Sequence, residues 1–84
     1  ALKLYQNGVP IYLTATEAAL LKLLADHAGA PVSRAALAQV TGEPTNERSV
    51  DVQITRLRKK IEREPGKPIY VQTIRNAGYQ LNVD

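Results

Sequence analysis

The sequence predicts that residues 1–84 form a single α+β domain, in which three helices lie between two short pairs of β-strands. In the middle of the chain, apolar residues recur every three or four positions, as they do along one face of a helix. Near both ends apolar and polar residues alternate instead, and a turn signal interrupts each alternating stretch, which is typical of a β-hairpin. The predicted order is therefore β-β-α-α-α-β-β.

The first half of the chain begins with a predicted hairpin and a helix. The strands are expected at residues 2–5 and 9–13, with Asn7-Gly8 as the turn between them. Residues 14–17, Thr-Ala-Thr-Glu, form a capping box that starts a helix ending near Ala28. The apolar stripe of this helix consists of Leu20, Leu21, Leu24 and Ala28.

A second, shorter helix is predicted between Ser33, its N-cap, and Gly42, which stops it. Residues 42–46 contain glycine and proline and cannot continue a helix, so they predict a loop. The inward residues of the second helix are expected to be Ala36, Leu37 and Val40.

The third helix is predicted over residues 47–63, with Asn46 as its N-cap and Pro65-Gly66 beyond its end. Its apolar residues follow a spacing of 4, 3 and 4 and share one face: Val50, Ile54, Leu57 and Ile61. The opposite face is basic, with one apolar residue near its middle, and it consists of Arg48, Val52, Thr55, Arg56, Lys59 and Arg63.

A second hairpin is predicted at the C-terminus, with strands at residues 69–74 and 79–83. Residues 75–78, Arg-Asn-Ala-Gly, join them, and Asn and Gly tolerate the positive φ of a tight turn. Three helices followed by a hairpin predict a winged helix-turn-helix. The tyrosines of the predicted strands are expected to pack in the core rather than stack on bases: Tyr5, Tyr12, Tyr70 and Tyr79.

The net charge of +3 is unevenly distributed along the chain. Residues 1–45 are neutral overall, whereas residues 46–84 carry eight basic and five acidic side chains. This asymmetry favours a polyanion as the partner, although a solvated charged surface has the same composition.

The composition argues against several other kinds of site. The chain has no cysteine, which rules out disulfides and thiolate metal sites. His27 is the only histidine, so neither a catalytic triad nor a histidine metal site has candidates, and we expect it near a helix C-terminus. No apolar run is long enough to span a membrane. We therefore expect no enzyme activity, no catalytic residue, no metal and no cofactor.

The outer face of the third helix offers groups that discriminate between bases. An Arg side chain pairs bidentately with O6 and N7 of guanine, and an apolar side chain packs against the methyl group of thymine. Arg56 and Val52 supply one of each, one helical turn apart. Lys59 and Arg63 come later in the helix and are expected to contact phosphates.

The acidic residues of the third helix have several interpretations. Asp51 could accept a hydrogen bond from a cytosine amino group, complement the helix dipole, or hold Arg48 three residues earlier. The ordinary i,i+4 ion pairs expected here are Arg58–Glu62 and Lys60–Glu64.

Two side chains of the C-terminal hairpin could reach DNA. Arg75 lies at the entry of the turn, and the negative potential of a narrow minor groove attracts such an arginine. The alternative is a solvated turn residue. Thr73 leaves the same face of the strand two residues earlier, and its hydroxyl could bind a phosphate.

Several segments resemble the DNA-binding domain of the OmpR/PhoB class of bacterial response regulators. Residues 47–62 are similar to the recognition helix of that family, and residues 69–79 are similar to its wing. Residues 13–17 followed by Leu20-Leu21 match its first helix, and residues 32–34 match its second. The resemblance implies a winged helix-turn-helix, of whose N-terminal antiparallel sheet this chain holds only a part.

The resemblance also implies roles for individual residues. By position, the base-contacting arginine of the family falls on Arg56, its methyl-contacting valine on Val52, and its wing arginine on Arg75. The implied phosphate contacts are Arg48, Ser49, Thr55, Arg58 and, in the wing, Thr73.

Partners and further domains are implied by the same resemblance. The partner would be double-stranded DNA with direct-repeat sites, bound by a head-to-tail homodimer that regulates transcription in the bacterial cytoplasm. The loop at residues 41–46 would touch RNA polymerase. A receiver domain, phosphorylated by a sensor kinase, would precede residues 1–84.

Three positions depart from the family pattern. Ala18 stands where an aromatic residue is usual, and Thr41 stands where a Trp is common, so the core is thinner and the polymerase loop less well matched. Asn76 replaces a wing glycine, which is a mild change because Asn tolerates positive φ.

Sequence-specific binding of duplex DNA is thus the leading hypothesis. One alternative is a winged-helix module that uses the same helix against an acidic protein and does not bind DNA. A small enzyme domain is another, but the chain lacks a nucleophile, a base and metal ligands for it. A steep dependence of affinity on salt would separate DNA binding from the protein-interaction module.

Overall fold

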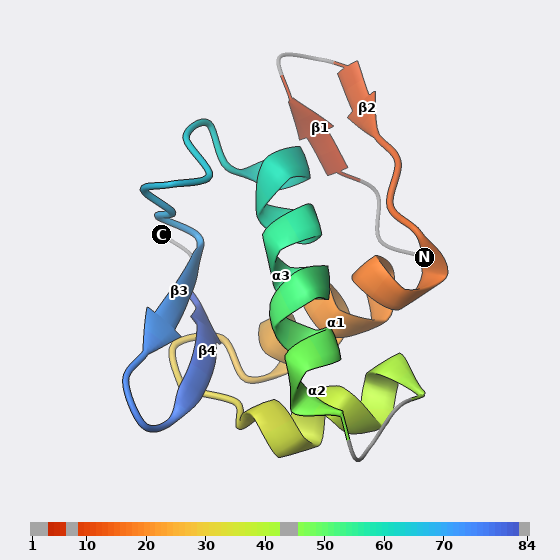
Figure 1. Cartoon of the computed structure of the whole chain (residues 1–84). Coiled ribbons are helices and arrows are strands. Elements are labelled where there is room, and N and C mark those ends of the chain that lie inside the picture. Colours follow the sequence, from red (N-terminus) through yellow and green to blue (C-terminus); the bar gives the residue numbers. More distant parts are fainter. Residues whose placement is uncertain (1–3, 7–8, 43–45, 83–84) are drawn as a thin grey trace.

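The computed structural model describes residues 4–6, 9–42 and 46–82 of the chain. Its elements are β1 (Leu4–Gln6), β2 (Val9–Ile11), α1 (Ala15–Asp26), α2 (Arg34–Thr41), α3 (Glu47–Ile61), β3 (Val71–Ile74) and β4 (Gly78–Leu81). In Figure 1, α3 runs through the middle of the molecule, α1 and α2 pack against it, and the β3–β4 hairpin lies beside it. This arrangement confirms the predicted α+β order and the helix-turn-helix with a C-terminal wing.

The three predicted N-caps start the three helices. The Thr14 hydroxyl accepts a hydrogen bond from the Glu17 amide at 3.1 Å, and the Glu17 carboxylate accepts one from the Thr14 amide at 2.9 Å, so the capping box is present. The side chains of Ser33 and Asn46 accept in the same way from the amide three residues later. These bonds satisfy amides that the first turn of a helix leaves without a partner.

α2 has the predicted bounds, but several other elements end or start elsewhere than the sequence predicts. α1 ends at Asp26, two residues before the predicted Ala28, and His27 is its C-cap, as expected of a residue near a helix C-terminus. β3 starts at Val71 rather than at residue 69, and the amides of residues 69 and 70 bond to the Glu62 side chain. The predicted turn at residues 7–8 lies outside the described residues.

The strands form two separate antiparallel pairs. β1 pairs with β2, with Leu4 opposite Ile11, and β3 pairs with β4, with Val71 opposite Leu81. A short bridge ties the second pair to the helices, because the amide of Val32 donates to the carbonyl of Tyr79 at 2.7 Å and the amide of Tyr79 donates back at 3.0 Å. The wing is therefore attached to the segment between α1 and α2.

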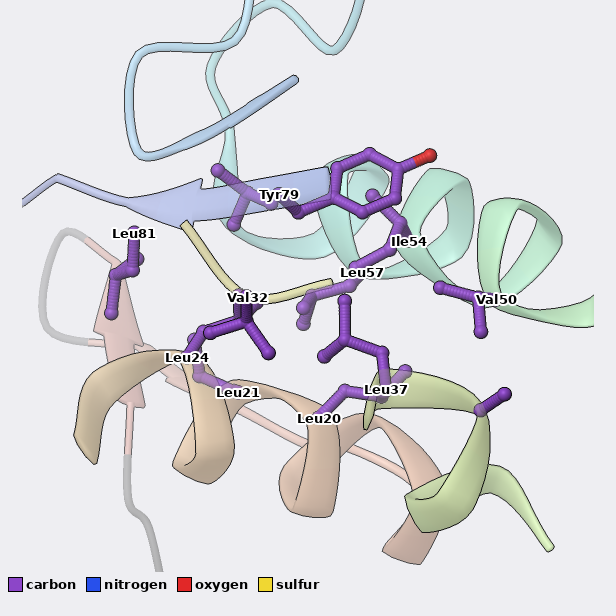
Figure 2. Close-up of a cluster of buried hydrophobic side chains, with 12 residues drawn as sticks. Leu20, Leu21, Leu24, Val32, Leu37, Val50, Ile54, Leu57, Tyr79 and Leu81 are labelled. Atoms are coloured by element: carbon purple, nitrogen blue, oxygen red, sulfur yellow. The ribbon is translucent and has the colours of Figure 1, made fainter. Parts of the chain in front are cut away.

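The core lies between the three helices and the wing. Figure 2 shows the leucines of α1 and α2 facing Ile54 and Leu57 of α3, with Tyr79 and Leu81 of β4 over the cluster. The buried apolar residues are Leu20, Leu21, Leu24, Val32, Leu37, Ala38, Val50, Ile54, Leu57, Val71, Tyr79 and Leu81. Leu13, Leu23, Val40 and Ile61 are partly buried and pack against them.

Some predicted core positions are wrong. Ala28 is exposed because α1 has already ended before it. In α2, Ala36 is exposed and Ala38 is buried in its place, because the face of this short helix is centred on Leu37 and Ala38. Val40 is only partly buried at the edge of this face.

The tyrosines also differ from the prediction. Tyr79 is buried as expected, but Tyr12 and Tyr70 have exposed fractions of 81% and 45%. Both lie just outside a strand, so the inward alternation of a sheet does not fix their direction. The side chain of Tyr5 lies outside the described part of the chain.

A buried ion pair joins α1 to α3. The ammonium group of Lys60 lies 2.5 Å from Oε1 of Glu17, so the predicted Lys60–Glu64 pair is wrong. Burial favours the neutral form of the Glu17 carboxyl, but the Lys60 ammonium and the Thr14 amide outweigh it and lower the pKa of Glu17. This pair stabilises the fold above the ordinary pKa range of glutamate, and its contribution is lost as the pH falls through the lowered value.

Candidate nucleic-acid interface

The two faces of α3 differ as the spacing predicts. Val50, Ile54 and Leu57 are fully buried against the core. The predicted outer residues are all exposed, namely Arg48, Val52, Thr55, Arg56, Lys59 and Arg63. Arg63 lies two residues beyond the end of the helix. These residues form a basic ridge on the surface of the molecule, with Val52 as its apolar residue.

Val52 and Arg56 sit one turn apart in the middle of this ridge. Val52 is 45% exposed although it is apolar, and no neighbouring segment covers it. Within the described residues, no hydrogen bond or ion pair occupies the guanidinium group of Arg56. The guanidinium group of Arg56 and the methyl groups of Val52 are thus both accessible from the solvent.

The hydroxyl residues of α3 have partners of their own. Ser49 is half-buried in the first turn, where its amide donates to the Asn46 side chain at 3.2 Å. The Thr55 hydroxyl donates to the carbonyl oxygen of Asp51 at 2.9 Å. A phosphate contact that uses the single proton of the Thr55 hydroxyl would require this bond to break.

The turn of the wing has the geometry that its residues predict. Asn76 has a φ of 64° and Gly78 a φ of 132°, and the amide of Ala77 donates to the carbonyl of Ile74 at 3.0 Å. Asn at the place of a wing glycine is compatible with this turn. Arg75 stands exposed at the tip, and no described partner occupies it.

Arg58 ties α3 to the wing. Its Nε donates to the carbonyl of Val71 at 3.0 Å, and its Nη2 donates to the Thr73 hydroxyl at 2.9 Å. Its guanidinium carbon lies 5.4 Å from the centre of the Tyr79 ring, within reach of a cation–π contact. The predicted Arg58–Glu62 pair is therefore wrong. The Thr73 hydroxyl is the acceptor of this hydrogen bond, so its own proton remains available for donation.

Asp51 is held by two side chains that are distant in the sequence. Arg34 approaches with Nη2 at 2.5 Å from Oδ2 and Nε at 3.1 Å from Oδ1, and the Tyr79 hydroxyl donates to Oδ1 at 2.6 Å. The structural interpretation of Asp51 as the partner of Arg48 is wrong, since Arg34 takes that place. Oδ2 keeps one lone pair, so the cytosine interpretation stays a prediction.

The same network shifts two pKa values. Burial, and then the hydrogen bond to Asp51, raise the pKa of Tyr79 to about 12. The hydrogen bond and the charge of Asp51 raise the pKa of Arg34. At neutral pH Tyr79 is therefore a neutral phenol and Arg34 carries its positive charge.

Glu62 is the C-cap residue of α3, and its carboxylate is 4% exposed. It accepts hydrogen bonds from the amides of Ile69, Tyr70 and Val71 at 2.8 to 3.2 Å. α3 ends at Ile61, two residues before the predicted end, and the C-cap Glu62 has an extended backbone. A carboxylate that accepts three amide bonds is one of the stronger anchors available to a loop.

A cleft lies between the first turns of α2 and α3 and the wing. It has a volume of about 650 Å³ and opens to solvent. Its lining includes Arg34 and Asp51 of the helices and Arg75 and Tyr79 of the wing. The ridge of α3 and the tip of the wing therefore flank a concave surface of mixed charge.

Sequence reasoning missed three residues that position this interface. From the sequence, Arg34 is noted only within residues 32–34, which match the second helix of the family, and Tyr79 is expected in the core. Gly78 was expected only to tolerate positive φ. Their partners lie far away in the sequence, so no local spacing of residues predicts these contacts. Within the described ranges, no helix is long and apolar enough to cross a membrane, and no cluster of acidic or histidine side chains could hold a metal.

Comparisons with known proteins agree with this geometry. Residues 8–81 match the family described as "Transcriptional regulatory protein, C terminal". Protein PetR of Rhodobacter capsulatus is 47% identical over 98% of this chain, which corresponds to 38% of PetR. The chain therefore spans less than half the length of this curated relative.

Two solved structures are similar over most of the chain. The response regulator DrrB of Thermotoga maritima, described as an OmpR/PhoB homolog, aligns with a TM-score of 0.86 at 36% identity, over 94% of this chain and 37% of DrrB. The RstA DNA-binding domain of Klebsiella pneumoniae, solved in complex with the RstA box, aligns with a TM-score of 0.82 at 35% identity, over 95% of this chain and 82% of the solved RstA domain.

Proposed function

Since this chain belongs to the family of transcriptional regulatory protein C-terminal domains, the winged-helix domains of OmpR/PhoB-type response regulators, we propose that it binds duplex DNA in a sequence-specific manner. α3 enters the major groove, and the wing places Arg75 in the adjacent minor groove. The domain thereby regulates transcription and catalyses no reaction of its own. The complex of the RstA domain with the RstA box supports this proposal.

The observation that carries the proposal is the exposure of Val52 beside Arg56 on an otherwise polar ridge. An exposed valine contributes nothing to solubility, but its methyl groups fit against thymine. Arg56 is free to pair with guanine. α3 and the wing also supply groups for phosphates, and we assign this role to Arg48, Ser49, Thr55, Arg58, Lys59 and Thr73.

Replacing Arg56 tests the base-reading role. We expect Arg56→Ala to cost about 1–3 kcal/mol on the preferred site and to relax the preference at one base pair. Lys59→Ala is the matched control, since it removes a neighbouring exposed charge that we assign to phosphate. It should weaken specific and random duplexes alike. The measurement is the affinity of each variant for specific and random duplexes at one salt concentration. Equal losses of affinity for Arg56→Ala on both kinds of duplex would contradict base reading.

The salt dependence distinguishes DNA binding from the protein-interaction alternative. Each phosphate contact releases condensed counterions, so the logarithm of the affinity should fall steeply against the logarithm of salt concentration. Lys59→Ala should reduce that slope by about 1. The comparisons support DNA binding and give the protein-interaction module no support.

Replacing Arg75 tests the minor-groove role. We expect Arg75→Ala to lose about fivefold in affinity on sites flanked by A·T-rich DNA, because the narrow groove there concentrates negative potential. On G·C-rich flanks the loss should be smaller. A loss that is independent of the flanking sequence would show that Arg75 is an ordinary surface charge.

The remaining expectations concern the longer protein. A receiver domain, phosphorylated by a sensor kinase, fits relatives of which this chain covers 38% and 37%. Head-to-tail dimers on direct repeats and a cytoplasmic location in a bacterium fit the same family. The loop at residues 41–46, of which residues 43–45 lie outside the described structure, is the part we assign to RNA polymerase.

A further inference from the structure

The wing is attached to one flank of α3 along its length. Asp51, Arg58 and Glu62 are spaced by seven and four residues, so they leave the helix on the same side. Glu62 holds the segment that enters β3, Arg58 holds the middle of β3, and Asp51 holds Tyr79 of β4. Each anchor joins a charged group of the helix to a different part of the hairpin.

These anchors matter because a two-stranded hairpin is only marginally stable on its own. The bridge between Val32 and Tyr79 ties the backbone of β4 to the segment before α2, whereas the side-chain anchors join the hairpin to α3 itself. Among the described anchors, those at Thr73 and Tyr79 lie nearest the turn. Thr73 and Tyr79 are directly opposite each other in the sheet, two residues before Arg75 and one after Gly78.

Tyr79 is built for such a role. Its ring lies in the core with the hydroxyl pointing away from the leucines (Figure 2). The hydroxyl donates to the Asp51 carboxylate at 2.6 Å. Arg34 holds both oxygens of that carboxylate, so Asp51 cannot follow the phenol if the wing swings away. The hydrogen bond therefore stretches or breaks when the wing turns relative to α3.

We propose that the hydrogen bond from Tyr79 to Asp51, braced by Arg34, is a clamp that fixes the direction of the wing relative to α3. The clamp lets Arg75 meet the minor groove while Arg56 reads the major groove. Tyr79 and Arg34 are thus positioning residues for recognition and need not touch DNA. Without the clamp, ordering the wing costs conformational entropy at the moment of binding. This inference rests on the proposed function, because it needs Arg75 to act in the minor groove.

The test compares two duplexes that share the selected core site and differ only in an A·T-rich or a G·C-rich flank. The ratio of the two affinities measures the wing contact, because contacts that are independent of sequence cancel in it. Tyr79→Phe keeps the ring in the core and removes only the hydroxyl. Tyr70→Phe is the matched control, since it removes a hydroxyl from an exposed tyrosine next to β3. Arg75→Ala defines the ratio when the wing makes no contact.

We expect Tyr79→Phe to lower the flank ratio about threefold, toward that of Arg75→Ala, while Tyr70→Phe keeps the wild-type ratio. Adding Arg75→Ala to Tyr79→Phe should change the ratio less than it does in the wild-type chain. All affinities are measured well below the thermal transition, so a lower stability alone leaves the ratio unchanged. If Tyr79→Phe does not fold, Arg34→Met removes the brace from the surface and should lower the ratio too.

Two results would overturn the clamp, and they differ in meaning. A folded Tyr79→Phe variant with the wild-type ratio, while Arg75→Ala abolishes the flank preference, removes the clamp and leaves the proposed function intact. A wild-type ratio near one removes the minor-groove role of the wing, and the clamp with it.

Discussion

Gly78→Ala is expected to destabilise the domain by about 4 kcal/mol or more, which is most of the stability of a domain of this size. Gly78 has a φ of 132°, a conformation that residues with a Cβ rarely adopt. An added Cβ would also overlap the carbonyl oxygen of Val32 and lie 2.9 Å from its carbonyl carbon. The wing would have to move away from Val32 and lose the bridge between Val32 and Tyr79.

Gly66→Ala is the matched control for this prediction. Gly66 lies in a turn where an added Cβ meets no atom within 4 Å, and its φ is not in the left-handed region. We expect its thermal midpoint to stay near that of the wild-type chain. Denaturation curves of the two variants measure the difference. Equal midpoints would mean that the wing does not depend on its close approach to Val32.

Glu62→Ala is the second large effect, with an expected loss of about 2–4 kcal/mol in the free energy of unfolding. The variant leaves three amide groups without their acceptor, and that of Val71 is buried where water cannot replace the carboxylate. Glu62→Gln should lose less, because its amide oxygen still accepts. The C-cap of α3 and the start of β3 would loosen together.

Glu64→Ala serves as the control, since Glu64 is an exposed glutamate two residues after Glu62, beyond the end of α3. Its loss should stay within about 0.5 kcal/mol. Urea unfolding with a common slope for all variants gives the comparison. If Glu62→Ala and Glu64→Ala lose the same stability, the carboxylate of Glu62 is no anchor for the wing.

Local patterns predicted most of the fold. Thr14, Ser33 and Asn46 mark helix starts because each satisfies an amide only three residues away. The 4-3-4 spacing placed Val50, Ile54 and Leu57 in the core because a helix fixes its own periodicity. The turn at Asn76 and Gly78 was predicted for the same reason, since positive φ is a property of single residues.

The errors concern contacts between distant segments. Glu62 was expected to pair with Arg58, but three amides of a later loop offer a buried carboxylate more bonds than one exposed guanidinium group. Lys60 reaches Glu17, which is 43 residues away in the sequence. The spacing of residues along a helix predicts which side chains of that helix lie close together. It contains no information about which other segment of the chain packs against them.

The candidate site was predicted in part. Exposure of the outer face of α3 is confirmed, and Arg75 stands at the tip of the wing. The contacts that orient these groups escaped prediction, because the hydrogen bond between Asp51 and Tyr79 depends on how α3 and β4 are packed. The assignment of individual residues to bases or phosphates stays a prediction.

Selection of bound duplexes from a random pool at moderate salt tests the central claim most directly. With the wild-type domain, the account predicts an enriched motif that contains a fixed guanine beside a fixed thymine, which correspond to Arg56 and Val52. Selection with Arg56→Ala should lose the fixed guanine, while selection with Lys59→Ala should return the wild-type motif. An unenriched pool, or an unchanged motif with Arg56→Ala, would contradict base reading by the outer face of α3.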